Sequence, residues 1–372
     1  MDTRIDFLYL SEQDTIDAGV NDAQQSVAVC REVFKLLAAG DYLMGGSSHN
    51  SHGMGLIFPK ESPFPNMPLA GPDRRFFAMP AYLGGKFDVC GNKWYGSNAA
   101  NTAKGLPRSI LTMILNDKDT GAPLCLMSAN LLSAARTGGV PGVAARELAR
   151  KDSRTAAVIG CGPINRSCIR HILSQMPGIE QIFCFDLFMD KAEATARWLT
   201  ETFSLRAEAT DNLEHAVHSA DVISVAASRL KPLYIDSKWL RKGTTILLTG
   251  PASGDEQFWT GSKIVLDHIG LHHTYVSEAI ESGDKETYYS GVIGGPIYRL
   301  IDSKKLPPLD DFTSIGQILN GQKSGRTNDD DIYIFVACGM GVFDVGLGYQ
   351  VYQNAKERGI GQTLLLWDKP AL

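Results

Sequence analysis

The 372-residue chain lacks the features of several protein classes. Its seven cysteines are odd in number, and none belongs to a C-x-x-C pair. This spacing argues against a disulfide framework and a structural zinc site, and it suits a reducing cytoplasm. The chain also has no long cluster of lysine and arginine, and its formal net charge is −5. We therefore expect no nucleic-acid partner.

The sequence also lacks a long uninterrupted apolar run. The first residues have no apolar core of the signal-peptide type. The most apolar late stretch, residues 335–352, contains Asp344 and several glycines, so we expect a packed element there and no membrane span. A composition of 44% hydrophobic and 21% charged residues is typical of a globular protein, and the length allows two domains. We expect a cytoplasmic location and no membrane partner.

One part of the sequence has the pattern of a strand–helix–strand unit. The apolar residues 156–159 lead into Gly160 and Gly162, and a helix-length segment follows. A second apolar stretch, residues 181–185, ends at Asp186. The first glycine permits a tight turn, the second lets the backbone approach a pyrophosphate, and the helix N-terminus supplies N–H donors. The pattern predicts a dinucleotide site.

The glycine fingerprint is incomplete, because Asn165 stands at its third glycine position. A carboxylate at Asp186 accepts hydrogen bonds from ribose hydroxyls and repels a 2′-phosphate, which favours NAD(H). Lys191 follows closely enough to leave NADP(H) as an alternative. The predicted cofactor contacts in this turn are Gly160, Gly162, Pro163, Ile164 and Asn165.

The order of the predicted elements indicates the fold class. From Thr155 onward, strands alternate with helices, which predicts an α/β fold with a Rossmann-type, doubly wound parallel sheet. The residues before 130 give strand candidates joined by turns, which predicts an α+β domain on a mostly antiparallel sheet. Residues 131–150 read as one or two helices between these parts, interrupted at Gly138, Gly139 and Pro141.

Five motifs, in order, resemble those of the ornithine cyclodeaminase/mu-crystallin family. They are residues 79–82 with 93–95, residues 116–124, residues 132–137, residues 314–321 with 325–326, and residues 339–344. Residues 73–75, 91–98 and 105–109 also resemble the branch that carries the label tyramine oxidase. The resemblance implies an NAD-binding domain, residues 131–314, and a discontinuous substrate and dimerisation domain, residues 1–130 and 315–372. It also implies a homodimer.

The resemblance implies an enzyme as well, an NAD(P)-dependent oxidoreductase that acts on the CH–NH or C=N group of a small amino or imino acid. Lys93 and Arg136 correspond to residues that hold the substrate carboxylate, and we expect both to be catalytic. Thr137 and Ser228 are expected beside the cofactor. The residue types suit the chemistry, since cations fix a carboxylate and a desolvated lysine can exchange a proton with the substrate nitrogen.

Two departures from the family pattern concern the substrate end of the site. Ala252 stands where ornithine cyclodeaminases carry an aspartate, and Asp255 replaces it only if the loop bends differently. An upstream arginine of many members has no equivalent here. Its region holds His49, and an insertion after it brings Arg75, so both are candidate substrate contacts. A cyclodeaminase-type ammonia-lyase and a non-catalytic cofactor- or ligand-binding protein stay open as alternatives.

Several conspicuous residues also have a structural interpretation. His49 and His52 lack a third ligand at useful spacing, so we predict no metal site. The pair His272–His273 resembles a solvated helix start. Asp344 matches an acidic position of the family's last motif, but a helix cap explains it equally well.

Overall fold

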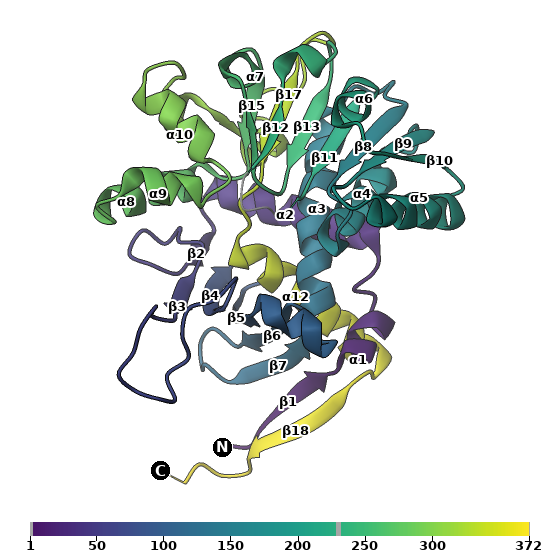
Figure 1. Cartoon of the computed structure of the whole chain (residues 1–372). Helices are drawn as coiled ribbons and strands as arrows, with labels where there is room; N and C mark the ends of the chain where they lie inside the picture. Colours follow the sequence, from purple (N-terminus) through teal and green to yellow (C-terminus); the bar gives the residue numbers. More distant parts are fainter. Residues whose placement is uncertain (1–2, 228–231, 372) are drawn as a thin grey trace. The chain divides into compact units, whose positions relative to one another are not determined.

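The structure is a computed structural model, which describes residues 3–227 and 232–371. The chain folds into two compact units (Figure 1). Unit 1 comprises Met1–Asp22, Gly40–Arg136 and Met340–Leu372, and unit 2 comprises Ala23–Ala39 and Thr137–Gly339. The predicted fold class is confirmed, since unit 1 contains both chain ends and unit 2 is a parallel α/β unit.

The boundaries differ from the predicted ones at residues 131 and 315. The chain passes between the units at Arg136–Thr137 and at Gly339–Met340, and also around the segment Ala23–Ala39. That segment forms a helix (α2) which packs on helices of unit 2. The strand Tyr333–Val336 (β17) pairs within the sheet of unit 2, so residues 315–339 belong there.

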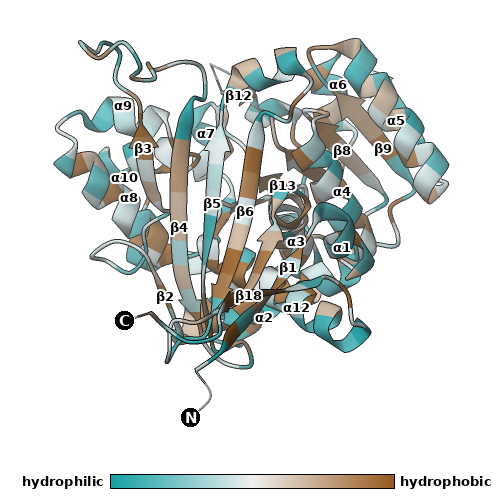
Figure 2. Ribbon diagram, turned by 90° about the horizontal axis from the view of Figure 1, so that it is seen from below, coloured by the Kyte–Doolittle hydropathy of each residue, from teal (hydrophilic) through white to brown (hydrophobic). Residues whose placement is uncertain are grey.

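Unit 1 is built on one sheet with the strand order β18-β1-β7-β6-β5-β4-β2, and β3 pairs with β4. The strands are β1 Ile5–Leu10, β2 Tyr42–Met44, β3 Met54–Ile57, β4 Arg75–Leu83, β5 Val89–Ser97, β6 Ser109–Asn116, β7 Pro123–Ser128 and β18 Gln362–Trp367. Only the β1–β7 pair is parallel among them. Seen from below, β4, β5 and β6 lie side by side, and much of β6 is hydrophobic (Figure 2).

The helix Gly341–Arg358 (α12) packs against β4, β5 and β6. Most of its residues are buried, which explains the apolar stretch seen in the sequence. A Cβ at Gly341 would lie 2.8 Å from the carbonyl oxygen of Met79, so only glycine permits this close approach. Short helices complete the unit, namely α1 Glu12–Asp17 and the 3₁₀ helix η1 Ala99–Lys104. No helix within the described ranges is long and apolar enough to cross a membrane.

Unit 2 holds a parallel sheet with the order β10-β9-β8-β11-β13-β17-β15-β16. The strands are β8 Thr155–Ile159, β9 Gln181–Phe185, β10 Arg206–Thr210, β11 Val222–Val225, β13 Thr245–Leu248, β15 Lys263–Leu266, β16 Thr313–Ser314 and β17. β12 Leu233–Ile235 and β14 Ala252–Gly254 form a separate parallel pair. The order runs outward in both directions from β8, so the carboxyl ends of β8 and β11 mark the switch point at which such sheets bind ligands.

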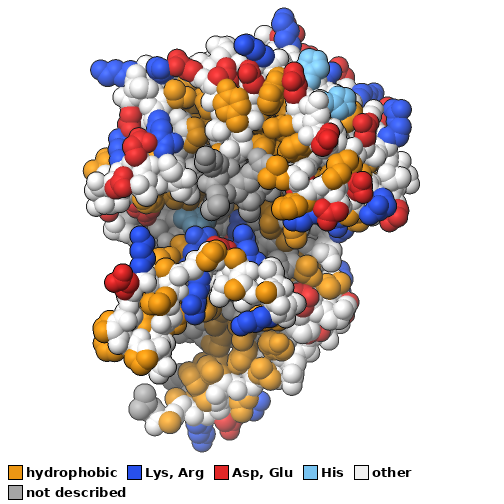
Figure 3. Space-filling model, viewed as in Figure 1, with side chains coloured by type: hydrophobic (Ala, Val, Ile, Leu, Met, Phe, Trp, Pro, Cys, Tyr) orange, Lys and Arg blue, Asp and Glu red, His pale blue; other side chains and the backbone are white. Residues whose placement is uncertain are grey.

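Helices surround this sheet. They are α2, α4 Pro163–Gln175, α5 Met189–Phe203, α6 Leu213–His218, α7 Glu256–Thr260, α8 Ile269–Glu281, α9 Lys285–Ser290, α10 Gly295–Asp302 and α11 Ile315–Leu319, with the 3₁₀ helices η2 Ser237–Trp239 and η3 Leu309–Asp311. On the face drawn in Figure 3, lysine and arginine side chains alternate with acidic ones, so this face carries no field of a single sign.

The helix Asn130–Leu148 (α3) is continuous, so the predicted interruption is wrong. Pro141 lacks an N–H for the carbonyl of Thr137, and the thiol of Cys168 donates to that carbonyl instead, at 3.9 Å. The glycines allow close packing. A Cβ at Gly139 would lie 2.7 Å from the sulfur of Cys30 on α2.

Candidate functional site

Three charged side chains form a buried cluster in unit 1. Nζ of Lys93 lies 2.9 Å from Oδ2 of Asp344 and 3.3 Å from Oγ of Ser133. Nε of Arg136 lies 3.1 Å from Oδ1 of the same aspartate. The side chains of Lys93 and Asp344 are 2% and 0% exposed. One carboxylate therefore bridges the two predicted catalytic cations.

Each member of the cluster is positioned by its own place in the fold. On β5, Lys93 stands opposite Met79 of β4 and Met113 of β6, which places it on the face that packs against α12. Ser133 and Arg136 are three residues apart on α3 and therefore share one helix face. Asp344 lies in the first turn of α12.

The electrostatics of the cluster suit an anionic ligand. Two cations and one carboxylate leave one positive charge in a buried place. Burial lowers the pKa of Lys93 to about 8, with Arg136 adding to the shift and Asp344 opposing it. Burial alone raises the pKa of Asp344, but Arg136 and Lys93 outweigh it and the net pKa is lowered. The cluster can bind a carboxylate, and Lys93 can exchange a proton near neutral pH.

The sequence analysis did not assign Asp344 to this cluster. The signal was present, because an acidic residue within an apolar helix must find a cationic partner when the helix is buried. The identity of that partner could not be deduced, because Lys93 lies 251 positions away along the chain.

The two other candidate substrate contacts lie apart from the three-residue cluster. His49 is exposed in a turn with φ of 56°, and its backbone N–H donates to the carbonyl of Gly46. Arg75 lies at the start of β4, where its guanidinium pairs with Asp73 at 3.1 Å and lies over the ring of Phe77. No contact of either residue with Lys93, Arg136 or Asp344 occurs among the described interactions.

In unit 2 the glycine turn after β8 has the geometry that a dinucleotide needs. Gly160 has φ of 87°, and a Cβ there would lie 2.9 Å from Ala227. A Cβ at Gly162 would meet nothing within 4 Å, so the backbone is open to a ligand. Gly162 is also the N-cap of α4 and provides no side-chain cap, while Pro163 occupies the first turn. The N–H groups of that turn can therefore bind phosphate oxygens.

Asn165 braces this turn from within. Its amide nitrogen donates to the carbonyl oxygens of Ile159, Gly160 and Ser224, and its oxygen accepts the hydroxyl hydrogen of Ser224. The side chain is fully buried. The structure thus uses its side-chain amide to shape the loop, whereas we predicted a cofactor contact. Ile164, the residue before it, is exposed.

Asp186 stands at the carboxyl end of β9, beside the glycine turn. Its Oδ2 accepts the N–H of Cys161 at 2.8 Å, and its Oδ1 accepts the N–H of Phe188 at 3.0 Å. Nζ of Lys191 lies 4.5 Å from the ring centroid of Phe188. The carboxylate therefore fixes the turn and stands where a ribose is expected. Thr137 follows Arg136 on α3, and the predicted contact Ser228 lies outside the described residues.

The family aspartate has no replacement at Asp255. Ala252 is buried in β14. Both carboxylate oxygens of Asp255 are engaged, because Oδ1 accepts the N–H of Ser237 at 2.9 Å and Oδ2 accepts its hydroxyl at 2.7 Å. These hydrogen bonds explain the position of Asp255 without a substrate.

His272 is not a solvated residue, so that interpretation is wrong. It is fully buried, with Nε2 at 3.0 Å from Oδ1 of Asp267 and Nδ1 at 2.7 Å from the hydroxyl of Tyr298. Oδ2 of Asp267 accepts the N–H of Cys338 at 2.6 Å. Asp267, His272 and Cys338 have the residue types of a metal site. Their hydrogen bonds already satisfy the carboxylate, so we interpret the group as part of the fold; His273 is exposed.

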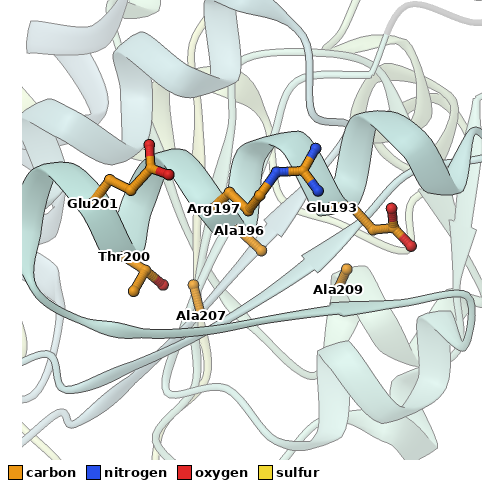
Figure 4. Close-up of a pocket in the computed structure, with 7 residues that line it drawn as sticks. All are labelled: Glu193, Ala196, Arg197, Thr200, Glu201, Ala207 and Ala209. Atoms are coloured by element: carbon orange, nitrogen blue, oxygen red, sulfur yellow. The ribbon is translucent and has the colours of Figure 1, made fainter.

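A shallow recess lies between α5 and the outer strand β10 (Figure 4). Its lining residues are Glu193, Ala196, Arg197, Thr200, Glu201, Ala207 and Ala209. None of the predicted site residues lines it, and β10 is separated from β8 by β9. We therefore assign the recess no role in binding the cofactor or the substrate.

Comparison with known proteins agrees with this geometry. The chain is 29% identical over 365 residues to N-((2S)-2-amino-2-carboxyethyl)-L-glutamate dehydrogenase of Staphylococcus aureus, and the match covers 97% of this chain and 99% of the relative. An archaeal alanine dehydrogenase dimer with bound NAD has a TM-score of 0.78 at 25% identity, covering 98% of this chain and all of the other.

A third similar protein is the Delta(1)-pyrroline-2-carboxylate reductase of Thermococcus litoralis in complex with NADH and L-proline. Its structure covers 96% of this chain and 99% of its own, with a TM-score of 0.78 at 23% identity, and this likeness concerns the fold. The narrower resemblance to the tyramine oxidase branch stays a prediction. The model of the ornithine cyclodeaminase/mu-crystallin family matches residues 20–359, and the chain belongs to that family.

Proposed function

We propose that this protein is an NAD(H)-dependent oxidoreductase that exchanges a hydride with the α-carbon of a small amino or imino acid. The buried Lys93–Asp344–Arg136 cluster is the observation that carries the proposal, because it combines a carboxylate clamp with a titratable lysine. The dehydrogenase of Staphylococcus aureus and the archaeal alanine dehydrogenase are relatives with this kind of activity. The physiological direction is that of an imine reductase or of an amino acid dehydrogenase.

Each residue of the site has its own task. Arg136 and Lys93 bind the substrate carboxylate and so fix the reacting carbon. Lys93 gives a proton to the substrate nitrogen during reduction and takes one during oxidation. In unit 2 the turn at Gly160 and Gly162 and the carboxylate of Asp186 hold the cofactor. When bound, NAD(H) supplies or accepts the hydride.

NADH consumption tests the proposal directly. We would assay the protein with cyclic imino acids and with 2-oxo acids plus amines, and in the reverse direction with amino acids and NAD⁺. Turnover of any imino acid establishes the reductase. If the protein binds NADH but turns over no substrate in either direction, the proposal is overturned in favour of a non-catalytic binding protein.

The pKa of Lys93 predicts opposite pH profiles for the two directions. Reduction requires the protonated ammonium, so kcat/KM is expected to fall as the pH rises through about 8. Oxidation requires the neutral amine, so kcat/KM is expected to rise through the same pH and then level off. Profiles from about pH 6 to 10 measure both limbs, since kcat/KM reports groups of the free enzyme. Two limbs that bend in the same direction would contradict this assignment.

Asp186 predicts the cofactor preference. The change Asp186→Asn is expected to weaken NADH binding by about tenfold or more, because hydrogen bonds to a charged group contribute about 1.5–3 kcal/mol. It is also expected to narrow the preference for NADH over NADPH, since the carboxylate no longer repels a 2′-phosphate. Fluorescence titration with both cofactors measures this, and Lys191→Gln is the control. An unchanged NADH affinity in Asp186→Asn would remove the carboxylate from the cofactor site.

We also infer a homodimer that forms through the outer face of the unit 1 sheet. Phe76, Trp94 and Ile110 are exposed by 36%, 42% and 52% on neighbouring strands. The first two rings stack with centroids 5.5 Å apart. Contiguous exposed apolar side chains of this kind mark interaction surfaces. Light scattering that gives a particle of one chain mass, 40.4 kDa, would exclude the dimer.

The cytoplasm is the location that we infer for the protein. All seven cysteines carry free thiols in the structure, which suits a reducing compartment. Thiol titration of the unfolded protein, purified without reductant, should recover every cysteine. A substantial loss of titratable thiol would argue for an oxidising compartment.

A further inference from the structure

We propose that the substrate is an amino or imino dicarboxylic acid, whose second acidic group binds Arg75. The inference rests on the function proposed above and specifies its substrate class. In this arrangement the α-carboxylate binds Lys93 and Arg136, and the distal carboxylate binds the guanidinium of Arg75.

Arg75 and Lys93 project from the same face of the sheet. Directly opposite residues of antiparallel strands share a face, and here Met79 pairs with Lys93, Phe77 with Tyr95 and Arg75 with Ser97. Alternate residues along a strand also share a face. Arg75 therefore lies on the α12-facing side of the sheet, with the Phe77–Tyr95 pair between it and Lys93.

A stack of rings separates the two cations. Nζ of Lys93 lies 5.8 Å from the ring centroid of Tyr95. The rings of Tyr95 and Phe77 are nearly parallel, at 9°, with centroids 5.6 Å apart. Cζ of Arg75 lies 5.2 Å from the ring centroid of Phe77. Aromatic side chains have few rotamers, so the stack holds one cation at each end at a defined separation.

The distal end keeps a positive charge. Arg75 and Arg108 share the single carboxylate of Asp73, at 3.1 and 3.2 Å. The Nε atom of Arg75 is buried and has no hydrogen-bond partner among the described residues. A buried donor of this kind requires an acceptor, and a ligand carboxylate provides one. The whole chain carries a net charge of −5, so two cationic ends on one sheet face are a local concentration of positive charge.

Tyr95 adds a neutral donor between the ends. Burial raises the pKa of its hydroxyl, while the guanidinium of Arg75 opposes the shift. The hydroxyl thus stays protonated at neutral pH and can donate to a carboxylate. A substrate with an apolar or cationic side chain leaves this donor and the Nε–H of Arg75 without an acceptor.

Calorimetric titration of the full-length protein with saturating NAD⁺ tests the inference. The ligands are L-aspartate, L-glutamate and L-2-aminoadipate, each paired with an uncharged counterpart of similar length, L-asparagine, L-glutamine and L-norleucine. We expect at least one acid to bind about tenfold more tightly than its counterpart, as a charge-assisted hydrogen bond predicts.

The variant Arg75→Gln is expected to abolish this preference and to leave the binding of the uncharged ligands unchanged. Arg74→Gln is the matched control, because Arg74 carries the same charge one position earlier but lies over Phe58. Equal binding of acids and counterparts overturns the inference, as does a preference that survives Arg75→Gln. If uncharged substrates are nevertheless turned over, the oxidoreductase function stands. If no ligand binds and no substrate reacts, both proposals fail.

Discussion

Replacing Lys93 with methionine is expected to lower kcat/KM by about a thousandfold or more, since general acid–base catalysis alone contributes about 10²–10⁴-fold. The change removes two contributions together. The substrate carboxylate loses one of its two cations, and the substrate nitrogen loses its proton donor or acceptor. NADH binding is expected to stay unchanged, because the glycine turn and Asp186 belong to unit 2.

The fold is expected to survive this change. Asp344 keeps its contact with Arg136 at 3.1 Å, so its carboxylate is not left without a cation. Methionine is unbranched and flexible, and it occupies a position flanked by Met79 and Met113 across the strands. Circular dichroism and the urea midpoint would verify that the variant is folded before its kinetics are interpreted.

A matched control separates the site from a general effect of charge. Lys86→Met removes the same charge from unit 1 at an exposed position over the ring of Phe87, and it should leave kcat/KM within about twofold of wild type, as surface substitutions usually do. Retention of more than a tenth of the wild-type kcat/KM in Lys93→Met would remove this lysine from the chemistry. Partial rescue of Lys93→Ala by a small alkylamine would support its role in proton transfer.

Local patterns sufficed to predict many of the elements. The strands Ser109–Asn116, Gln181–Phe185 and Lys263–Leu266 have the predicted ends, because charged or turn-forming residues delimit each apolar run. The glycine turn after β8 was also predictable, since the need for a positive φ at Gly160 is written in the residue itself. These features depend on neighbours within a few positions.

Features that depend on distant partners were not predictable in this way. The strand Gln362–Trp367 pairs with Ile5–Leu10, at the opposite end of the sequence. The glycines of α3 resembled helix breakers, but they provide room for α2 and α4 to approach. Pro141 is tolerated because a thiol from α4 replaces its missing N–H. Tertiary packing decided each of these cases, and a local propensity carries no information about it.

The candidate site shows the same division. Motifs identified Lys93 and Arg136 as candidates, and a motif also contained Asp344, but the sequence did not show that one carboxylate contacts both cations. His272 was misinterpreted for a related reason. Its partners Asp267 and Tyr298 come from different elements, and burial cannot be deduced from a His–His pair alone.

Asp344→Ala is expected to lower the free energy of unfolding by about 3–5 kcal/mol, because it leaves buried charges without a partner. Lys93 and Arg136 then face each other as like charges in a buried place. Urea denaturation monitored by circular dichroism measures the loss. Asp344→Asn keeps the shape and is expected to cost less, so this variant suits kinetics.

Asp344→Asn also tests whether the aspartate tunes Lys93 or only supports the fold. In the wild type, the carboxylate of Asp344 raises the pKa of Lys93 against the effect of burial, and the net value is about 8. Removing that negative charge lowers the pKa further, so both limbs of the pH profile are expected to move to lower pH. A purely structural role predicts a loss of stability with an unmoved profile.

A double-mutant cycle then isolates the pairwise contribution. Lys93→Met should destabilise Asp344→Asn less than it destabilises the wild-type protein, because its partner charge is already absent. Coupling energies of about 0.5–3 kcal/mol are typical of residues that share an ion-pair network. A coupling energy of zero would mean that the charge of Asp344 does not stabilise the ammonium of Lys93. In that case burial and Arg136 alone would set the pKa of Lys93, and the proton-transfer role would depend on its desolvation and not on a bridging carboxylate.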